Sequence, residues 1–193
     1  MVTTQQTEHD VVAILMQDHR EVESMFNELD VLRGSQAADT VQRRKELAEQ
    51  AVIELVRHSV AEEAEVYPRI RERIDSAEAD KLIHDQSEAE LTMKRLEKLD
   101  ADQPEFEAEL QKLISEIKAH VAEEERVAFP RLREVFSADE LAEMGRKVEA
   151  VKKTAPTRPH PSAPDQPPGN KALGPMAGLV DRIRDSLTGR GTA

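Results

Sequence analysis

The chain of 193 residues contains no cysteine. This absence excludes disulfide bonds, cysteine-ligated zinc, iron–sulfur clusters and thiol catalysis. Any metal ion in the protein must therefore be bound by histidine and carboxylate side chains, a ligand set that suits iron, manganese or zinc rather than copper(I). The length fits one domain plus an appendage, and such a domain can bury a core without a disulfide or a structural metal.

The N-terminus also lacks the features of a signal peptide, because residues 1–10 hold neither a basic stretch nor an apolar one. Nowhere does the chain contain a run of about 18 apolar residues, the length that a transmembrane helix requires. These two absences predict a soluble, cytoplasmic protein without a transmembrane segment.

Acidic residues outnumber basic ones, 39 to 27, and the formal net charge at pH 7 is −12. The exception is the C-terminal part, where basic residues outnumber acidic ones from Lys152 onward. The strongly acidic body should repel nucleic-acid phosphates. We therefore expect no nucleic acid among its partners.

Glycine is rare, proline is absent before Pro68, and alanine, glutamate, leucine, arginine and lysine are abundant. This composition predicts helix through about the first 150 residues. In the first helix, apolar residues and one histidine recur at steps of three and four, which indicates one buried face: Val12, Leu15, His19, Val22, Phe26 and Leu29. The pattern predicts further helices over about 37–73, 76–99, 105–130 and 138–152. The expected fold is all-α: an up-down-up-down antiparallel four-helix bundle with a short fifth helix.

The chain is expected to have three parts. Residues 1–152 form the bundle, and residues 153–175 are a proline-rich segment that should be a disordered linker. Residues 176–193 have the pattern of a short amphipathic helix, which is too short to be stable alone. We expect that segment to contact a protein partner, the body or a membrane surface.

An internal repeat is the most informative feature, because residues 54–68 recur 62 positions later as residues 116–130. Each copy carries a histidine and a glutamate four residues apart, so on a helix both project from one face, roughly 6 Å apart. Each copy therefore predicts one edge of a metal site. The matched pairs are His58 with His120, Glu62 with Glu124, Tyr67 with Phe129 and Pro68 with Pro130.

The candidate ligands should lie at one depth in the bundle. On antiparallel neighbours, two positions are level when the turn falls midway between them. The midpoint of His19 and His58 falls in the predicted turn at 34–39, and that of His84 and His120 falls at Asp102. A lone histidine on an apolar face usually just packs, but four at matching depth favour a site. The predicted metal ligands are His19, His58, Glu62, His84, His120 and Glu124.

Other polar residues near these positions are weaker candidates. Five could lie around the ligands, although a solvated carboxylate or a packed ring is the simpler interpretation of each: Glu23, Glu54, Glu88, Glu116 and Tyr67. The helical phase of Glu63 and Glu125 predicts that both are solvated. His9 and His160 fall in the terminus and the proline-rich segment, so we expect them outside the site.

The ordered motif His19, His58-x-x-x-Glu62, His84, His120-x-x-x-Glu124, with Tyr67-Pro68 and Phe129-Pro130 after its second and fourth parts, resembles the hemerythrin-like (HHE cation-binding) family. The four-His, two-Glu set resembles the actinobacterial type within it. The resemblance implies two non-haem iron ions joined by an oxo or hydroxo group, with manganese or zinc as alternative metals. By position, the four histidines would be terminal ligands, and the two glutamates would bridge the ions.

The motif departs from that of the invertebrate oxygen carriers of this family. Those proteins have a fifth histidine where this chain has Glu88, and their fourth-helix carboxylate falls at the position of Glu125. Fewer histidines leave more room at the metals for solvent or an added ligand. Oxygen storage is therefore not the expected function.

The resemblance leaves three functions open, and whether the protein is an enzyme stays open with them. The first is catalase-like breakdown of hydrogen peroxide under oxidative or nitrosative stress, with no catalytic residue distinct from the metal centre. The second is reversible binding or sensing of O2 or NO. The third is iron handling, including repair of damaged iron centres. The expected partners are these small molecules, and the sequence does not set the oligomeric state.

Overall fold

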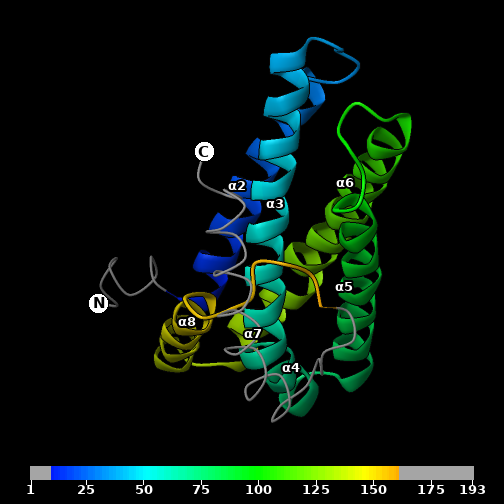
Figure 1. Cartoon of the computed structure of the whole chain (residues 1–193). Helices are drawn as coiled ribbons and strands as arrows, with labels where there is room; N and C mark the ends of the chain where they lie inside the picture. Colours follow the sequence, from blue (N-terminus) through cyan, green and yellow to red (C-terminus); the bar gives the residue numbers. More distant parts are fainter. Residues whose placement is uncertain (1–9, 161–193) are drawn as a thin grey trace.

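The computed structural model describes residues 10–160, and no strand occurs in that range. Four long helices form two antiparallel pairs, α2 with α3 and α5 with α6 (Figure 1). Shorter helices extend or follow them. The predicted all-α bundle with a short fifth helix is confirmed. The helices are α2 (Val11–Val31), α3 (Ala38–Glu65), α4 (Tyr67–Arg73), α5 (Ser76–Leu96), α6 (Pro104–Glu123), the π-helix η1 (Glu124–Ala128), α7 (Phe129–Val135) and α8 (Ala138–Lys152).

Local sequence signals set the starts of the helices. The Asp10 carboxylate accepts a hydrogen bond from the Ala13 amide at 2.8 Å, and Asp75 caps α5 in the same way. Ser137 and Glu140 form a capping box at the start of α8. At α6, Pro104 occupies the first turn, where its missing N–H costs nothing. The starts of α2, α5, α6 and α8 are therefore set locally, whereas the N-cap residue of α3, Ala37, makes no side-chain cap hydrogen bond.

Two apolar clusters fill the bundle, one on each side of the level of His19, His58 and His120. The first lies where the two long helical pairs face each other and includes Phe26, Leu55, Met93, Leu113 and Ile117. The second lies where α4, α7 and α8 close the other end and includes Leu15, Ile70, Leu82, Leu132 and Met144. The level of the histidines therefore lies between two mostly apolar layers.

The prolines of the repeat interrupt both helices that carry it. Pro68 has no N–H to donate and its ring crowds the preceding turn. Accordingly α3 ends at Glu65, Val66 has φ −106° and ψ −58°, and α4 begins at Tyr67. Before Pro130 the chain instead forms the π-helix, in which the Phe129 amide donates to the Glu124 carbonyl five residues earlier. Both prolines thus interrupt the helix that carries them, although the two interruptions differ in form.

Residues 155–160 lie against the bundle, whereas the sequence predicted a disordered linker from 153 onward. Ala155, Thr157 and Pro159 are buried, and the Lys94 ammonium donates to the Pro159 carbonyl at 3.2 Å. In Figure 1 this orange segment runs from α8 across α3 towards α5. Proline loses little backbone freedom on ordering, which favours such packing. The remainder of the linker and the amphipathic pattern predicted at 176–193 lie outside the described residues.

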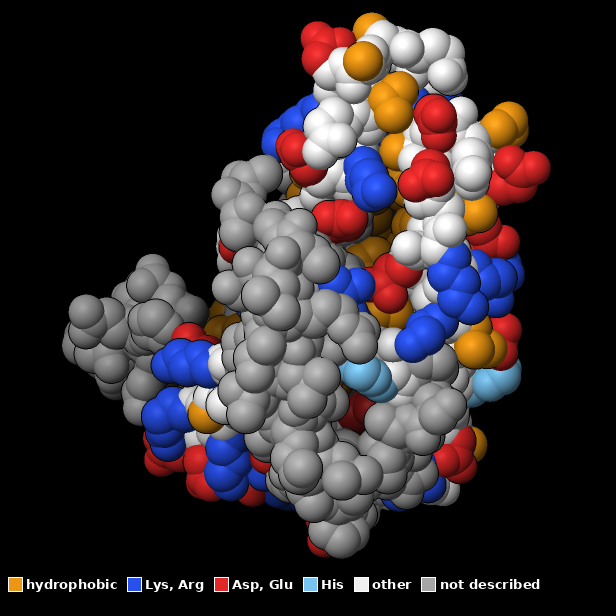
Figure 2. All heavy atoms as spheres, in the orientation of Figure 1, with side chains coloured by type: hydrophobic (Ala, Val, Ile, Leu, Met, Phe, Trp, Pro, Cys, Tyr) orange, Lys and Arg blue, Asp and Glu red, His pale blue; other side chains and the backbone are white. Residues whose placement is uncertain are grey.

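Where the described residues form the face shown in Figure 2, charged side chains of both signs are spread over it, and hydrophobic side chains are visible in the hollow between the two long helical pairs. Within the described range, no helix is both long enough and apolar enough to cross a membrane.

Candidate metal centre

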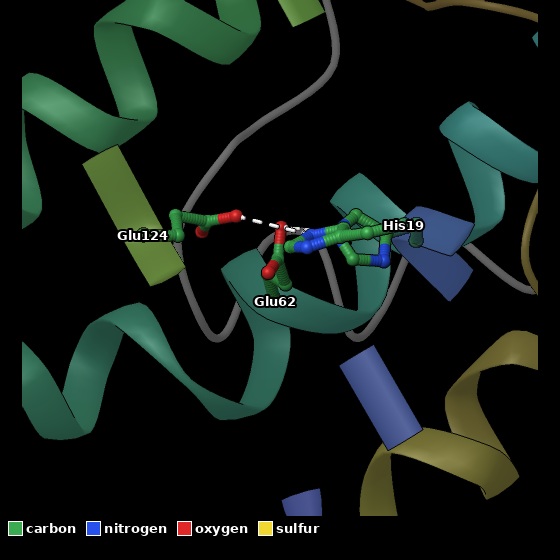
Figure 3. A group of neighbouring side chains, drawn as sticks. His19, Glu62 and Glu124 are labelled. Atoms are coloured by element: carbon green, nitrogen blue, oxygen red, sulfur yellow. Dashed lines mark hydrogen bonds and ion pairs between the residues drawn. The ribbon is translucent and has the colours of Figure 1, made fainter. Parts of the chain in front are cut away.

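Four buried side chains from three elements converge between the apolar clusters. His19 comes from α2, His58 and Glu62 from α3, and Glu124 from the start of η1. Each offers a ligand atom, and the four atoms all lie within 4.8 Å of one another. Figure 3 shows the side chains of His19, Glu62 and Glu124 pointing toward one another.

Short distances link these four residues. The Nε2 atoms of His19 and His58 are 3.3 Å apart. His58 Nε2 lies 3.1 Å from Glu62 Oε2, and His19 Nε2 lies 3.4 Å from Glu124 Oε2. Imidazole nitrogens and carboxylate oxygens thus face a common centre, as ligands of one cation do.

A third buried imidazole, that of His120 on α6, also adjoins the carboxylates. Its Nε2 is 3.5 Å from Glu124 Oε2 and 3.3 Å from the Tyr67 hydroxyl. We call His19, His58, Glu62, His120 and Glu124 the histidine–carboxylate cluster. It contains five of the six side chains predicted as ligands.

The sixth predicted ligand, His84, is exposed on α5 and does not reach this cluster. Its predicted facing is wrong because the apolar arc of that helix is broad, and the residues that turn inward are Leu82, Gln86, Ala89 and Met93. Gln86 takes the inward position and its Nε2 lies 2.6 Å from Glu62 Oε2. The same depth rule would have accepted Gln86, since its midpoint with Glu62 falls at the turn before α5. Glutamine is a rare ligand, so the signal was weak.

Tyr67 is fully buried and its hydroxyl lies among the cluster oxygens. The hydroxyl is 2.9 Å from Glu124 Oε1 and 3.0 Å from Glu62 Oε2, and it also accepts from Gln86 Nε2 at 2.7 Å. On an unbroken helix Tyr67 would point almost opposite to His58. The break at Val66 instead directs it inward. Of the five weaker candidates from the sequence, this is the one with a direct hydrogen bond to the cluster.

Two imidazoles have their outer nitrogen held by a carboxylate. His19 Nδ1 lies 3.0 Å from Glu125 Oε1, and Arg20 donates one hydrogen bond to each oxygen of the same carboxylate. His58 Nδ1 lies 3.1 Å from Asp18 Oδ2, and Lys152 of α8 donates to the same carboxylate group. A proton held on Nδ1 leaves the Nε2 lone pair facing the cluster, which is the tautomer that binds a metal.

Sequence reasoning missed Asp18 and wrongly assigned Glu125 to solvent. The contacts of Asp18 with His58 and of Glu125 with His19 depend on how α2 packs against α3 and η1. The spacing of residues within one helix cannot predict such packing between helices. Glu63 was also expected to be solvated but is buried.

The other four weaker candidates do not hydrogen-bond to the cluster. Glu23 and Glu88 are exposed. Glu54 pairs with Arg57 at 2.9 Å, and Glu116 with Lys112 at 3.5 Å. Of the two remaining histidines, His9 lies outside the described residues, and His160 lies beyond α8 in the segment that packs on the bundle.

Burial of two carboxylates side by side controls the electrostatics of the cluster. Burial and the charge of Glu124 raise the pKa of Glu62. Burial also disfavours the charge of Glu124, but His120 and His19 outweigh it and lower the pKa to about 2. Burial likewise opposes protonation of His58, yet the charge of Glu62 and the contact with Asp18 raise its pKa to about 10. The site therefore favours positive charge at its centre.

The cluster fits a bound cation by a second criterion. Glu62 is completely buried, and its Oε1 atom has no hydrogen-bond partner among the described residues. The same is true of His120 Nδ1. An unpartnered buried carboxylate oxygen is costly. A positive ion between these side chains would remove that cost, and their nitrogen and oxygen donors suit iron, manganese or zinc.

Comparison with known proteins agrees with this geometry. The hemerythrin HHE cation binding domain matches residues 10–132. An uncharacterized hemerythrin-like protein of Schizosaccharomyces pombe is 32% identical over 176 residues, which cover 90% of this chain and 84% of the yeast protein. A DNA nickase of Nostoc sp. is 26% identical over 139 residues, which cover 72% of this chain but 38% of the nickase. No solved structure is significantly similar. Since the matched residues make up more than half of the chain, the chain belongs to the hemerythrin HHE cation-binding domain family.

Proposed function

We propose that the histidine–carboxylate cluster holds two iron ions and that the protein breaks down hydrogen peroxide. The observation that carries this proposal is the convergence of five buried side chains from α2, α3, α6 and η1. His19 and His58 would bind one ion, His120 the other, and Glu62 and Glu124 would lie between the two. The second ion would then have one imidazole instead of the two expected from the sequence.

The chain supplies positioning and proton handling around these ions. A bound iron pair would provide two-electron redox chemistry and a free coordination position. Asp18 and Glu125 orient the two imidazoles through Nδ1. Burial and the charges of Glu124 and Glu62 raise the pKa of Tyr67 well above its usual value. The phenol therefore keeps its proton on Oη, within hydrogen-bond reach of both carboxylates.

Disproportionation of peroxide suits this arrangement. One molecule of hydrogen peroxide is reduced to two of water and a second is oxidised to O2, so protons must leave one molecule and reach the other. Tyr67 Oη, which receives a hydrogen bond from Gln86, is the neutral acid nearest to the carboxylates. We assign to it the relay of a proton between the two half-reactions, in which the hydroxyl gives up its own proton as it takes another and so stays neutral.

A pair of histidine variants tests the proposal. His58→Ala removes an imidazole of the cluster, whereas His84→Ala removes an exposed one from α5. Iron content and O2 release from peroxide are measured after growth with excess iron. We expect both to be lost in His58→Ala and kept in His84→Ala. Wild-type protein that carries iron but releases no O2 would contradict the peroxide reaction, and its optical spectra with O2 and NO would then test gas binding.

We do not extend the nicking of DNA to this chain. The similarity covers 38% of the nickase. The net charge of −12 would repel a nucleic-acid backbone.

A further inference from the structure

A cavity of about 250 Å³ adjoins the histidine–carboxylate cluster between the two long helical pairs. One end of it is polar and is lined by His19, His58, His120 and Gln86. Glu62 and Glu124, which are completely buried, do not line it. A molecule in the cavity would therefore meet the imidazole edges of the cluster first.

The rest of the cavity is mostly apolar. Its walls come from all four long helices, with the side chains of Val22, Phe26, Leu55, Ala89, Ile117 and Val121. Four exposed residues mark its opening to the surface, on α2 and α6: Arg20, Glu23, Lys118 and Ala122. The charges at the opening are of both signs, and Arg20 is already paired with Glu125. The opening therefore does not select for a charged ligand.

The cavity is much larger than hydrogen peroxide. Liquid water occupies roughly 30 Å³ per molecule, so the volume corresponds to about eight water molecules. Water along the apolar walls has few hydrogen-bond partners, and a ligand with an apolar body gains free energy by displacing it. A reaction of hydrogen peroxide alone does not need this mostly apolar part of the cavity.

We propose that the cavity binds neutral organic hydroperoxides, with the apolar body against its walls and the O–O group at the imidazole end. This inference rests on the proposed peroxide chemistry and names a further substrate class for the same site. The reaction balances with hydrogen peroxide as the reductant. The O–O bond of the organic hydroperoxide breaks to give an alcohol and water, and hydrogen peroxide gives up two electrons and two protons to become O2.

Binding is tested with an unreactive probe, 2-phenyl-2-propanol, which is the alcohol product of cumene hydroperoxide. The full-length, iron-loaded protein is titrated with this probe by ligand-observed NMR. Ala122→Phe places a ring at the opening of the cavity. Ala119→Phe is its matched control, because Ala119 is exposed on the same helix but does not line the cavity. Ala89→Leu fills the interior from α5 and gives a second, independent obstruction.

We expect Ala122→Phe and Ala89→Leu each to weaken probe binding at least tenfold, and Ala119→Phe to leave it unchanged. The ratio of kcat/KM for cumene hydroperoxide to that for hydrogen peroxide should fall in Ala122→Phe relative to Ala119→Phe. Equal probe binding in the wild type and both obstructed variants would overturn the proposal. Probe binding that follows this pattern in a protein inert to hydrogen peroxide would overturn the peroxide chemistry and leave the cavity as a binding site for apolar molecules.

Discussion

The two copies of the repeat place a histidine and a glutamate alike but surround them differently. In the first copy, α3 breaks at Val66 and the Tyr67 hydroxyl enters the cluster. In the second, the chain passes through a π-helix, and the ring of Phe129 stacks on His19 with centroids 5.6 Å apart and planes 11° apart. One copy thus adds a proton donor and the other an apolar cover.

The imidazoles of the two copies also differ in support. His58 is held through Nδ1 by Asp18, whereas His120 Nδ1 has no hydrogen-bond partner in the part of the chain that the structure describes. Equal spacing in the sequence has therefore produced two unlike halves of one site. The half that contains His58 is the more rigidly positioned, and the half that contains His120 has more freedom to change its ligands.

Removal of the metal is the largest expected perturbation, because both halves depend on it. At free metal about 1,000-fold above its Kd, binding to the native state stabilises it by roughly 4 kcal/mol. For a domain of this size that corresponds to a rise in Tm of roughly 10 °C, measured by calorimetry before and after chelation.

Both copies should contribute to that rise, so Glu62→Ala and Glu124→Ala should each abolish most of it. A full rise in either variant would show that one copy alone holds the metal.

Replacing Tyr67 of the first copy by phenylalanine, the residue at the matching position of the second, should have the next largest effect on stability. Tyr67→Phe removes the hydroxyl shared by Glu62, Glu124 and Gln86. Leaving such buried groups without a partner should cost about 2 kcal/mol in the metal-free protein, measured by urea unfolding. The cost should shrink after iron loading, because the metal would then satisfy the carboxylates.

Phe129→Leu is the matching change in the second copy. It removes the stack on His19 and should cost about 1 kcal/mol whether or not metal is bound. If iron loading changed the stability loss of both variants equally, the proposed difference between the two copies would be contradicted.

The unequal support of the imidazoles can be tested directly. Asp18→Asn should lower metal affinity at least tenfold, because loss of an outer partner of a metal-binding histidine typically costs about 10- to 100-fold. Burial opposes the charge of Asp18, but His58 and Lys152 lower its pKa, so the carboxylate is ionised at neutral pH. Glu116→Gln, four residues before His120, should change affinity much less. Affinities are measured by competition with a chelator, and equal losses would count against the assignment.

The smallest expected effect lies away from both copies, at the start of α8. A backbone hydrogen bond from Ser137 and a contact with Arg73 lower the pKa of Glu140 to about 2, from a usual value of 4.5. The contribution of ionised Glu140 to the stability of the fold is therefore complete above about pH 4.5 and is lost as the pH falls through about 2.

Ser137→Ala should lower the free energy of unfolding by about 1 kcal/mol without changing iron content. A change in iron content would mean that the position of α8 affects metal binding at the cluster.

The fold and most of the cluster could be predicted because they depend on patterns within single helices. The period of apolar residues fixed the inward faces of α2, α3 and α6, and with them His19, His58 and His120. On α5 the apolar arc was too broad to choose a face, so His84 was predicted inward where Gln86 lies. The roles of Asp18 and Glu125 could not be predicted, because they arise from the crossing of separate helices.

The end of α8 and the segment that follows it support the site, although both lie outside the region matched by the family model. That match ends at residue 132, yet Lys152 reaches Asp18 behind His58, and residues 155–160 fasten the end of α8 to α5 across α3. A fragment trimmed to the matched region would keep every residue of the cluster. It would lose the contacts of Lys152 with Asp18 and of residues 155–160 with α5. Protein intended for metal loading should accordingly be produced with the chain continued at least to His160.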